Sequence, residues 1–291
     1  MSSEHLPVLV REVNEILVLN MDGFYIDATV GLGGHTGQIL KLLGSNGKVL
    51  GIDRDDEALK RTGEKLMDSR LILKKGNFSD IGALLHSQGV DEVDGILFDL
   101  GVSMMQLRDL ERGFSFNSDE RLDMRMDRSL DFSAWDVVNG YPVKELIRIL
   151  KEYGEEYNAP RIVRAISSFR QRKSIDTCSE LAGIISGAVG RRGRINPATK
   201  TFQALRIEVN KEIEELKKGL DASLKILKKG GRFCVISYHS IEDRVVKNFI
   251  RDNARQGTLK QLMKKPMTPG TEELRVNPSS RSAKMRGAER L

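Results

Sequence analysis

Glycines and carboxylates recur where β-rich apolar segments end. Residues 24–30 run into the cluster Gly31–Gly34, and His35 follows at once. A strand that enters a glycine loop and then a helix presents backbone amides at the positive end of that helix, where a ligand can approach closely. A second segment, residues 48–53, ends in Asp53, 22 residues after Gly31. A carboxylate at that place can accept hydrogen bonds from ribose hydroxyls, so the spacing predicts a nucleotide-like site.

The glycine spacing narrows the class of ligand. Gly31 and Gly33 fit the first two positions of the dinucleotide fingerprint GxGxxG, but the third position is Thr36, and the sequence has no GxxxxGK[ST] phosphate loop. Together with Asp53 this favours an adenosine-containing ligand without a pyrophosphate. S-adenosylmethionine fits better than NAD, although an NAD-dependent oxidoreductase stays open as an alternative. For Asp53 the alternative is a helix N-cap or a turn acid.

The elements that position these residues alternate in kind along the first hundred residues. Strand-like segments at 24–30, 48–53, 70–75 and 93–99 are separated by helix-like segments that include 35–43 and 56–67. This alternation predicts βαβ units and a parallel sheet, which binds ligands at the carboxyl ends of its strands.

The pattern changes beyond residue 102. Residues 107–198 contain no convincing strand: a charged, methionine-rich loop at 111–128 precedes helices within 143–189. A long helix is expected over 201–228, a strand at 232–238 resumes the sheet, and the last ~35 residues are expected to be irregular. We therefore predict a Rossmann-like α/β domain formed by 1–106 and 199–291, with an inserted all-helical subdomain at 107–198 for substrate recognition.

Charge and cysteine content exclude other classes. The 291-residue chain is 40% hydrophobic, which excludes a wholly disordered protein. Two basic stretches stand out: residues 244–291 hold 12 basic and 4 acidic residues, and residues 160–200 hold 9 and 2. They indicate a polyanion-binding protein, the alternative being lysines and arginines that only aid solubility. Cys178 and Cys234 form no CxxC pair, and no apolar run reaches ~18–20 residues. We expect a cytoplasmic protein without a disulfide framework, a metal ion or a membrane span.

Eight motifs form a more specific set, three of them inside the insertion or at its end. They are Gly31–His35, Ile52–Arg54, Phe98–Ser103, Glu111–Phe116, Leu122–Asp127, Ala198–Arg206, Ile236–Arg244 and Asn277–Arg286. Over nearly its whole length the chain resembles the bacterial 16S rRNA (cytidine-N(4)) methyltransferases of the RsmH/MraW family. The resemblance implies methyl transfer from S-adenosyl-L-methionine to the exocyclic amine of a cytidine near the ribosomal P site.

The resemblance also assigns residues to the cofactor. It implies Gly33, Gly34 and His35 at the aminoacyl end of S-adenosylmethionine, Asp53 at the ribose and Phe78 near the adenine, with Asp99 and Gln106 completing the set. Simpler roles stay open: Phe78 could belong to the core, His35 could only begin a helix, and Gln106 could be an ordinary loop residue. The chain departs from the family at Val102–Gln106, where a polar residue more often precedes the glutamine.

The chemistry needs a group that holds the cytosine amine and takes its proton. Asp99 is the expected residue, because it ends the fourth strand where many amino-methyltransferases carry an Asp/Asn/Ser-Pro-Pro-aromatic tetrad that this sequence lacks. The alternative is a purely cofactor-binding role. His239 could accept or relay a proton, or be structural.

The expected substrate is RNA on a particle. Phe114, Phe116 and Tyr238 could clamp one flipped base. The partner would be 16S rRNA within an assembled or late-assembling small subunit, and a homodimer stays open. The rival interpretations are a non-catalytic RNA-binding assembly factor and a methyltransferase for DNA or a protein amine.

Overall fold

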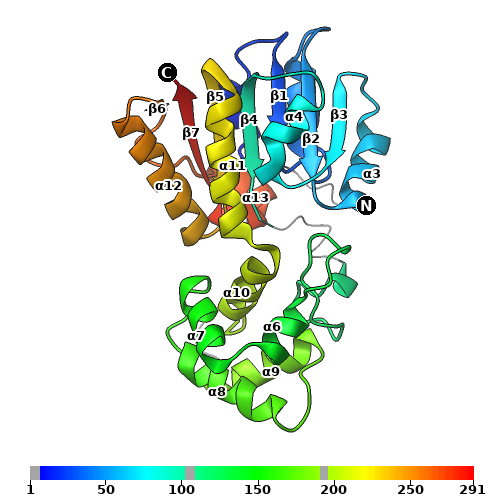
Figure 1. Ribbon diagram of the computed structural model, residues 1–291, viewed down its shortest axis with the longest axis vertical. Helices are drawn as coiled ribbons and strands as arrows, with labels where there is room; N and C mark the ends of the chain where they lie inside the picture. The colour runs from blue at the N-terminus through cyan, green and yellow to red at the C-terminus, as the bar shows by residue number, and fades with distance from the viewer. Residues whose placement is uncertain (1–6, 102–108, 191–195) are drawn as a thin grey trace. The chain divides into compact units, whose positions relative to one another are not determined.

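The chain folds into two compact units. The computed structural model describes residues 7–101, 109–190 and 196–291. The sheet unit comprises residues 1–101 and 213–291, and the helical unit comprises 102–212 (Figure 1). The junctions lie at 101/102 and 212/213, whereas the sequence pattern predicts them at 106/107 and 198/199, and the substrate-recognition role of the insertion stays a prediction.

The sheet unit is built on seven strands in the order β3-β2-β1-β4-β5-β7-β6. The five parallel strands are β1 (Phe24–Asp27), β2 (Lys48–Asp53), β3 (Leu71–Lys75), β4 (Val93–Asp99) and β5 (Leu227–Ser237). Strand β7 (Lys284–Arg290) runs antiparallel to both β5 and β6 (Leu259–Gln261). The strand order reverses between β1 and β4, and a crevice forms beyond the carboxyl ends of strands at such a point. The predicted α/β fold is therefore confirmed.

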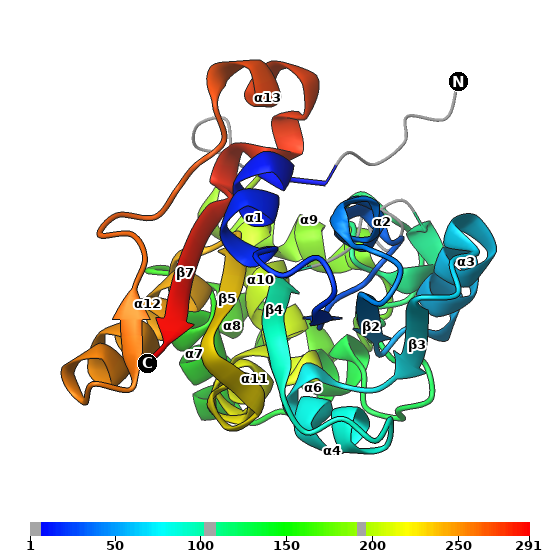
Figure 2. The ribbon, with the colours of Figure 1, turned by 90° about the horizontal axis from the view of Figure 1, so that it is seen from above.

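Helices cover both faces of this sheet (Figure 2). Successive strand residues point to opposite faces. Tyr25, Val49 and Leu97 accordingly share one buried cluster with α1 (Val10–Leu17) and α2 (Gly34–Leu42). The second buried cluster lies on the opposite face of the sheet and contains the neighbouring strand residues Ile26, Leu50 and Ile96. They pack there with α4 (Ile81–His86), α11 (Glu212–Ile226) and α12 (Ser240–Arg255). Helix α3 (Asp56–Leu66) connects β2 to β3. Because helices pack on both faces of the sheet, the strand ends are well placed to position the side chains of a site.

The helical unit has a hydrophobic core of its own. It contains η2 (Leu110–Arg112), α6 (Ala134–Gly140), α7 (Val143–Glu152), α8 (Ala159–Arg170), α9 (Cys178–Val189) and α10 (Thr199–Asn210). The helices expected within 143–189 are confirmed, and the described residues of this unit form only an isolated bridge, Arg121 to Thr177, and no strand. The methionine-rich loop is held from inside, because the Asn210 side-chain amide donates to the Met124 carbonyl and its oxygen accepts from the Met126 amide.

The helix predicted over 201–228 is wrong as a single element. It breaks at Lys211, whose φ of 52° is left-handed, into α10 and α11. Phe202, Leu205 and Val209 on α10 pack into the core of the helical unit. Burial of this apolar face explains why residues 199–212 group with the insertion rather than with the sheet.

The irregular tail predicted for the last ~35 residues is also wrong. It contains β6, α13 (Thr271–Val276), η3 (Pro278–Ser282) and β7. Strand β7 forms because it pairs with both β5 and β6, so its backbone hydrogen bonds come from partners distant in sequence. The strand predicted at 232–238 begins earlier, at Leu227. Among the described residues, no helix combines the length and the apolar character that a membrane span requires.

Candidate active site

Three carboxylates end three neighbouring strands at the reversal of strand order. Asp27 ends β1, Asp53 ends β2 and Asp99 ends β4. Because β1 lies between β2 and β4, these residues line one edge of the sheet. Sequence reasoning singled out Asp53 and Asp99 but missed Asp27, although a carboxylate in the β-rich segment that leads into the glycine loop was the signal that could have found it.

The glycine loop adopts a conformation that side chains would oppose. Gly31 and Gly33 have positive φ values of 50° and 71°, and Gly33 is the N-cap of α2. A Cβ on Gly33 would lie 2.8 Å from Leu66 Cδ1 and from Thr62 Cγ2 of α3. The Thr62 hydroxyl donates to the Gly31 carbonyl at 2.7 Å. The loop is therefore pressed against α3 and presents the amino end of α2, as the sequence predicted for a ligand site.

Asp53 holds this loop to β2. Its Oδ2 accepts a hydrogen bond from the Gly31 amide at 2.9 Å, and its Oδ1 accepts one from the Asp55 amide at 3.0 Å. Burial raises the pKa of Asp53, and the two amide hydrogen bonds oppose that rise. The helix N-cap is instead Asp55, whose side chain accepts from the Glu57 amide. Each carboxylate oxygen can accept a further hydrogen bond, so Asp53 can still bind ribose hydroxyls.

Phe78 lies beyond β3 and is partly buried. Its ring meets Phe98 of β4 edge-on with centroids 5.9 Å apart, and the Arg54 guanidinium lies 5.8 Å from the ring centroid. Helix α11 approaches so closely that a Cβ on Gly219 would lie 3.0 Å from Phe78 Cδ2. The ring thus packs on the core and on an arginine that follows Asp53, and its contact with the adenine stays a prediction.

Asp99 is the most strongly perturbed carboxyl of the site. Its Oδ1 accepts a hydrogen bond from the Tyr238 hydroxyl at 3.0 Å, and its Oδ2 lies 3.6 Å from His35 Nε2. Burial, with the charges of Asp27 and Glu242, raises the pKa of Asp99 to about 7, although the Tyr238 hydrogen bond opposes the rise. A carboxyl with this pKa can exchange a proton at neutral pH.

His35 combines a helix-start position with a position at the site. It is the second residue of α2, and its ring is buried against Asp99. The structure therefore brings His35 and Asp99, 64 residues apart in sequence, to one place.

Thr36 accounts for the failure of the dinucleotide fingerprint. Its hydroxyl donates to Asp27 Oδ2 at 2.6 Å, while Asp27 Oδ1 accepts from the Thr29 amide at 3.2 Å. Thr29 in turn accepts from the Asp99 amide through its hydroxyl oxygen at 2.7 Å. Burial raises the pKa of Asp27 to about 6. A glycine at position 36 would leave this buried carboxyl without its side-chain donor.

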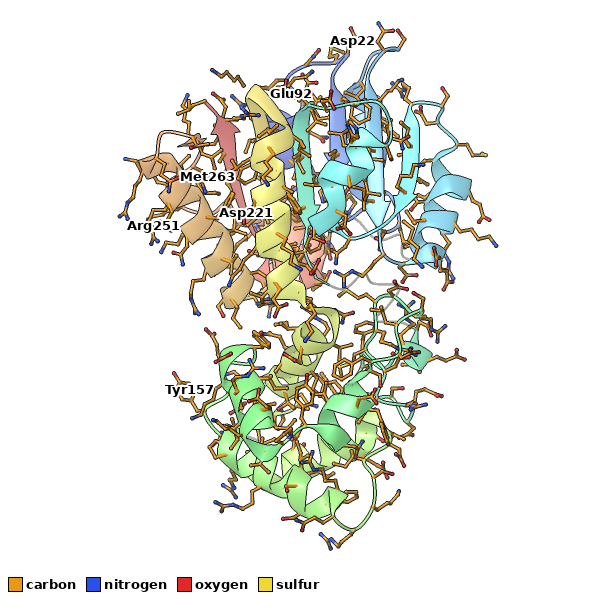
Figure 3. All side chains as sticks on the ribbon, viewed as in Figure 1. Asp22, Glu92, Tyr157, Asp221, Arg251 and Met263 are labelled. Atoms are coloured by element: carbon orange, nitrogen blue, oxygen red, sulfur yellow. The ribbon has the colours of Figure 1, made fainter. Side chains whose placement is uncertain are left out.

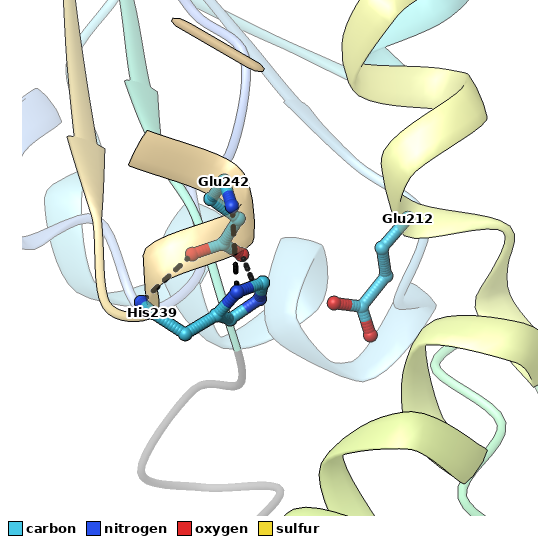
Figure 4. A group of neighbouring side chains, drawn as sticks. All are labelled: Glu212, His239 and Glu242. Atoms are coloured by element: carbon cyan, nitrogen blue, oxygen red, sulfur yellow. Dashed lines mark hydrogen bonds and ion pairs between the residues drawn. The ribbon is translucent and has the colours of Figure 1, made fainter. Parts of the chain in front are cut away.

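His239 is the N-cap of α12 (Figure 4). Its Nδ1 accepts from the Glu242 amide at 3.4 Å, and its Nε2 lies 3.1 Å from Glu242 Oε1. Glu242 Oε2 also accepts from the Tyr238 amide at 2.9 Å. This capping arrangement accounts for the histidine structurally, and its role in proton transfer stays a prediction.

The remaining candidates fall outside this cluster. Gln106 lies outside the described residues, as do Val102–Met105. Phe114 is buried in the core of the helical unit, and Phe116 packs edge-on against Phe202. Cys178 and Cys234 are buried free thiols. The absence of a metal ion from the reaction stays a prediction.

The chain is similar to several known proteins. The MraW methylase family model matches residues 2–291. A protein of Persephonella marina named ribosomal RNA small subunit methyltransferase H is 53% identical over 294 residues, covering 99% of each chain. A protein of the same name from Caldicellulosiruptor saccharolyticus is 47% identical, again over 99% of each chain. A crystallised rRNA methylase of Streptococcus thermophilus is similar with a TM-score of 0.46 and 12% identity, over 97% of this chain and 93% of that one.

The fold and the carboxylate-lined glycine loop are those of a Rossmann-like methyltransferase that uses S-adenosyl-L-methionine. The chain belongs to the MraW methylase family.

Proposed function

We propose that this enzyme methylates the exocyclic N4 of a cytidine in the P-site region of 16S rRNA, acting in the cytoplasm on the assembled or late-assembling small subunit. The observation that carries the proposal is the 53% identity, over 99% of both chains, with a protein named for small-subunit rRNA methylation. The choice of N4 rests on the motif resemblance and on the chemistry available at Asp99.

The cofactor-binding part of the proposal assigns each ligand group to a named residue. Gly33, Gly34 and His35 would face the aminoacyl end, Asp53 the ribose hydroxyls and Phe78 the adenine, with Asp99 and Gln106 completing the set. Bound there, S-adenosylmethionine supplies a methyl group on a positively charged sulfur. The amide-rich loop and the ring of Phe78 beside Arg54 support these assignments.

The chain must then activate a poor nucleophile. The lone pair of the cytosine amine is delocalised into the ring, so the site must hold the nitrogen in line with the methyl carbon. Such positioning can supply about 7–11 kcal/mol of the barrier. As the N–C bond forms and the C–S bond breaks, the amine gains positive charge and must lose a proton. Asp99, with a pKa of about 7, is the group that we assign to accept it.

Basic side chains would hold the RNA backbone. Lys247, Arg251 and Arg255 lie on α12, where Figure 3 shows Arg251 extending from the outer side of the helix. Lys264 and Lys265 are exposed after β6. Such contacts to phosphates give binding that depends on salt and carries little sequence information. Choice of nucleotide would then come from the shape of RNA on the assembled particle.

A methyl-transfer assay with radiolabelled S-adenosylmethionine tests the function. The substrates are small subunits from cells that lack this gene, small subunits from wild-type cells, and naked rRNA, and mass spectrometry identifies the labelled nucleoside. We expect N(4)-methylcytidine on the deficient subunits alone. No label on any substrate, with cofactor binding intact by calorimetry, would contradict the proposal and leave a non-catalytic binding factor or another acceptor.

The substitution Asp99→Ala tests whether Asp99 accepts the proton or only binds the cofactor. For a residue that accepts the proton as well as contacting the cofactor, turnover should fall far more than cofactor affinity does. An equal loss of turnover and cofactor affinity would reduce Asp99 to a cofactor ligand.

A further inference from the structure

The Tyr238 hydroxyl donates the hydrogen bond that Asp99 Oδ1 accepts at 3.0 Å. The two residues are 139 positions apart, and they meet because β4 and β5 are parallel neighbours whose ends coincide. Asp99 pairs with Ile236 in the sheet register, and the Leu100 amide donates to the Ile236 carbonyl at 2.9 Å. The contact is therefore built into the sheet.

The backbone of Tyr238 is fixed by α12, and the chain that leaves β4 passes beside its ring. Its backbone amide donates to Glu242 Oε2 at 2.9 Å, so the start of α12 fixes the residue after β5. On the other side the chain leaves β4 through Gly101, whose φ of 101° favours glycine. A Cβ there would be 3.5 Å from Tyr238 Cδ2. These contacts place the ring beside the end of β4, where its hydroxyl meets Asp99.

The charges around Asp99 make this donor important. Asp27 and Glu242 both oppose ionisation of Asp99, and Tyr238 itself lies near the charges of Glu242 and Glu273. His35 Nε2 is 3.6 Å from Oδ2. The Tyr238 hydroxyl is thus the neutral donor that stabilises the Asp99 carboxylate among several negative neighbours.

We propose that Tyr238 is a positioning residue for methyl transfer, which fixes Oδ1 of Asp99 and leaves Oδ2 as the oxygen that accepts the proton. This inference rests on the proposed proton transfer to Asp99. It extends that proposal by naming the residue that sets the orientation and the proton affinity of the carboxyl.

The test compares Tyr238→Phe with wild type in two measurements. The first is the pH profile of methyl transfer to deficient small subunits. The second, which needs no activity, is a titration of the Asp99 carboxyl carbon by NMR in protein labelled at aspartate, with the signal assigned through Asp99→Asn.

Tyr238→Phe keeps the ring and removes the hydroxyl. Loss of a donor to a carboxylate favours its protonated form, so the carboxyl pKa should rise by about one unit. The acidic limb of the activity profile, on which activity rises as Asp99 loses its proton, should move to higher pH by the same amount. Turnover should fall about tenfold below the limb and recover toward the wild-type value above it. Cofactor Kd should change less than about threefold.

Tyr141→Phe is the matched control. The Tyr141 hydroxyl donates to Glu208 Oε1 at 2.7 Å in the helical unit, so the substitution also removes a tyrosine-to-carboxylate hydrogen bond. It should leave both the Asp99 titration and the position of the pH limb unchanged.

The outcomes separate the two proposals. An unmoved Asp99 titration and pH limb in Tyr238→Phe, with an active and folded enzyme, would overturn the role of Tyr238. If Tyr238→Phe shifts the Asp99 titration but the wild-type enzyme methylates no small subunit, the proposed function would be overturned instead. A shifted titration together with a shifted pH limb would support both.

Discussion

Thr36 and Asp27 form a buried hydrogen bond of 2.6 Å between the first turn of α2 and the end of β1. Asp27 is almost completely inaccessible to solvent, and burial raises its pKa to about 6 while the Thr36 hydrogen bond lowers it. A single hydroxyl therefore does what a third glycine of a dinucleotide-binding loop could not: it satisfies a carboxyl under the glycine loop.

Thr36→Val should destabilise the protein by about 1–3 kcal/mol, because it leaves the buried Asp27 carboxyl without its side-chain donor. The loss should be greater at pH 8 than at pH 5, since the hydrogen bond is stronger to the ionised carboxylate. Urea denaturation at both pH values measures it. Thr62→Val, which removes a hydrogen bond to the neutral Gly31 carbonyl, should show a loss that does not change with pH. Equal losses at both pH values for Thr36→Val would contradict this view of Asp27.

Asp27 and Asp99 should contribute less to stability as the pH rises from about 4 to about 7. The folded-state pKa values of Asp27 and Asp99 are raised to about 6 and about 7, against an ordinary value of 3.8. In this window these two carboxyls bind more protons in the folded protein than in the unfolded chain, so a rise in pH weakens their contribution to folding. Asp99→Asn should remove the contribution of Asp99.

The Asp99→Asn protein should therefore be more stable than wild type at pH 8, by on the order of 1–2 kcal/mol, while its turnover falls. Chemical denaturation at pH 5 and pH 8 checks the first statement. Asp221→Asn, at an exposed position of α11 labelled in Figure 3, is the control and should change neither quantity. If the Asp99→Asn protein were less stable than wild type at pH 8, ionised Asp99 would not be destabilising in the folded protein, and the raised pKa of Asp99 would be contradicted.

Gly33→Ala should weaken cofactor binding at least tenfold. The new methyl group would meet Thr62 and Leu66 at 2.8 Å, so the loop must move away from α3. The cost in stability should be about 2–3 kcal/mol, of which backbone strain at positive φ is about 1–2. Gly89→Ala isolates the strain, because Gly89 has a φ of 69° and no atom within 4 Å of the added Cβ. Calorimetric titration with S-adenosylmethionine distinguishes the two variants, because only Gly33→Ala should lose affinity for the cofactor.

Gly219→Ala should lower cofactor affinity severalfold through Phe78. The added Cβ would lie 3.0 Å from the Phe78 ring and 3.1 Å from its carbonyl oxygen, so the ring must shift. Gly183→Ala in α9 is the comparison, since nothing lies within 4 Å of its Cβ. It should stabilise the protein by about 0.5–1 kcal/mol as a helix-interior glycine replacement. Unchanged cofactor Kd in Gly219→Ala would argue against adenine binding at Phe78.

The double variant Lys264→Gln/Lys265→Gln should weaken binding to small subunits and make it less sensitive to salt. If each lysine contacts one phosphate, the slope of log affinity against log salt should decrease in magnitude by about 2. Binding measured by filter retention at several salt concentrations gives the slope. Lys218→Gln, on α11 beside Glu215, should leave it unchanged. An unaltered slope in the double variant would remove these lysines from the RNA interface.

Much of the sheet could be predicted from the sequence because its strands are buried on both faces. Residues 48–53 and 93–99 were predicted with the bounds of β2 and β4, since a short apolar run between two helical patterns is typical of a strand inside a parallel sheet. Asp53 and Asp99 could be predicted at the site for the same reason: a polar residue at the end of such a run lies at the carboxyl edge of the sheet.

The break at Lys211 and the structure of the tail could not be predicted this way. Residues 201–228 keep an amphipathic pattern, but α10 buries its apolar side in a different core from α11, and only packing reveals the change. Strand β7 carries charged residues and no apolar alternation, and it is a strand because β5 and β6 pair with it on either side.

The sequence by itself determined the alternation of strands and helices over residues 24–99, the glycine loop, and Asp53 and Asp99 at the strand ends, because these follow from local propensity and hydrophobic pattern. Only the tertiary structure decided that Tyr238 meets Asp99, that Thr36 satisfies Asp27 and that His35 lies against Asp99. The physical reason is that proton affinity at the site depends on burial and on neighbouring charges. Most of those neighbours are distant in sequence and are brought together by strand pairing.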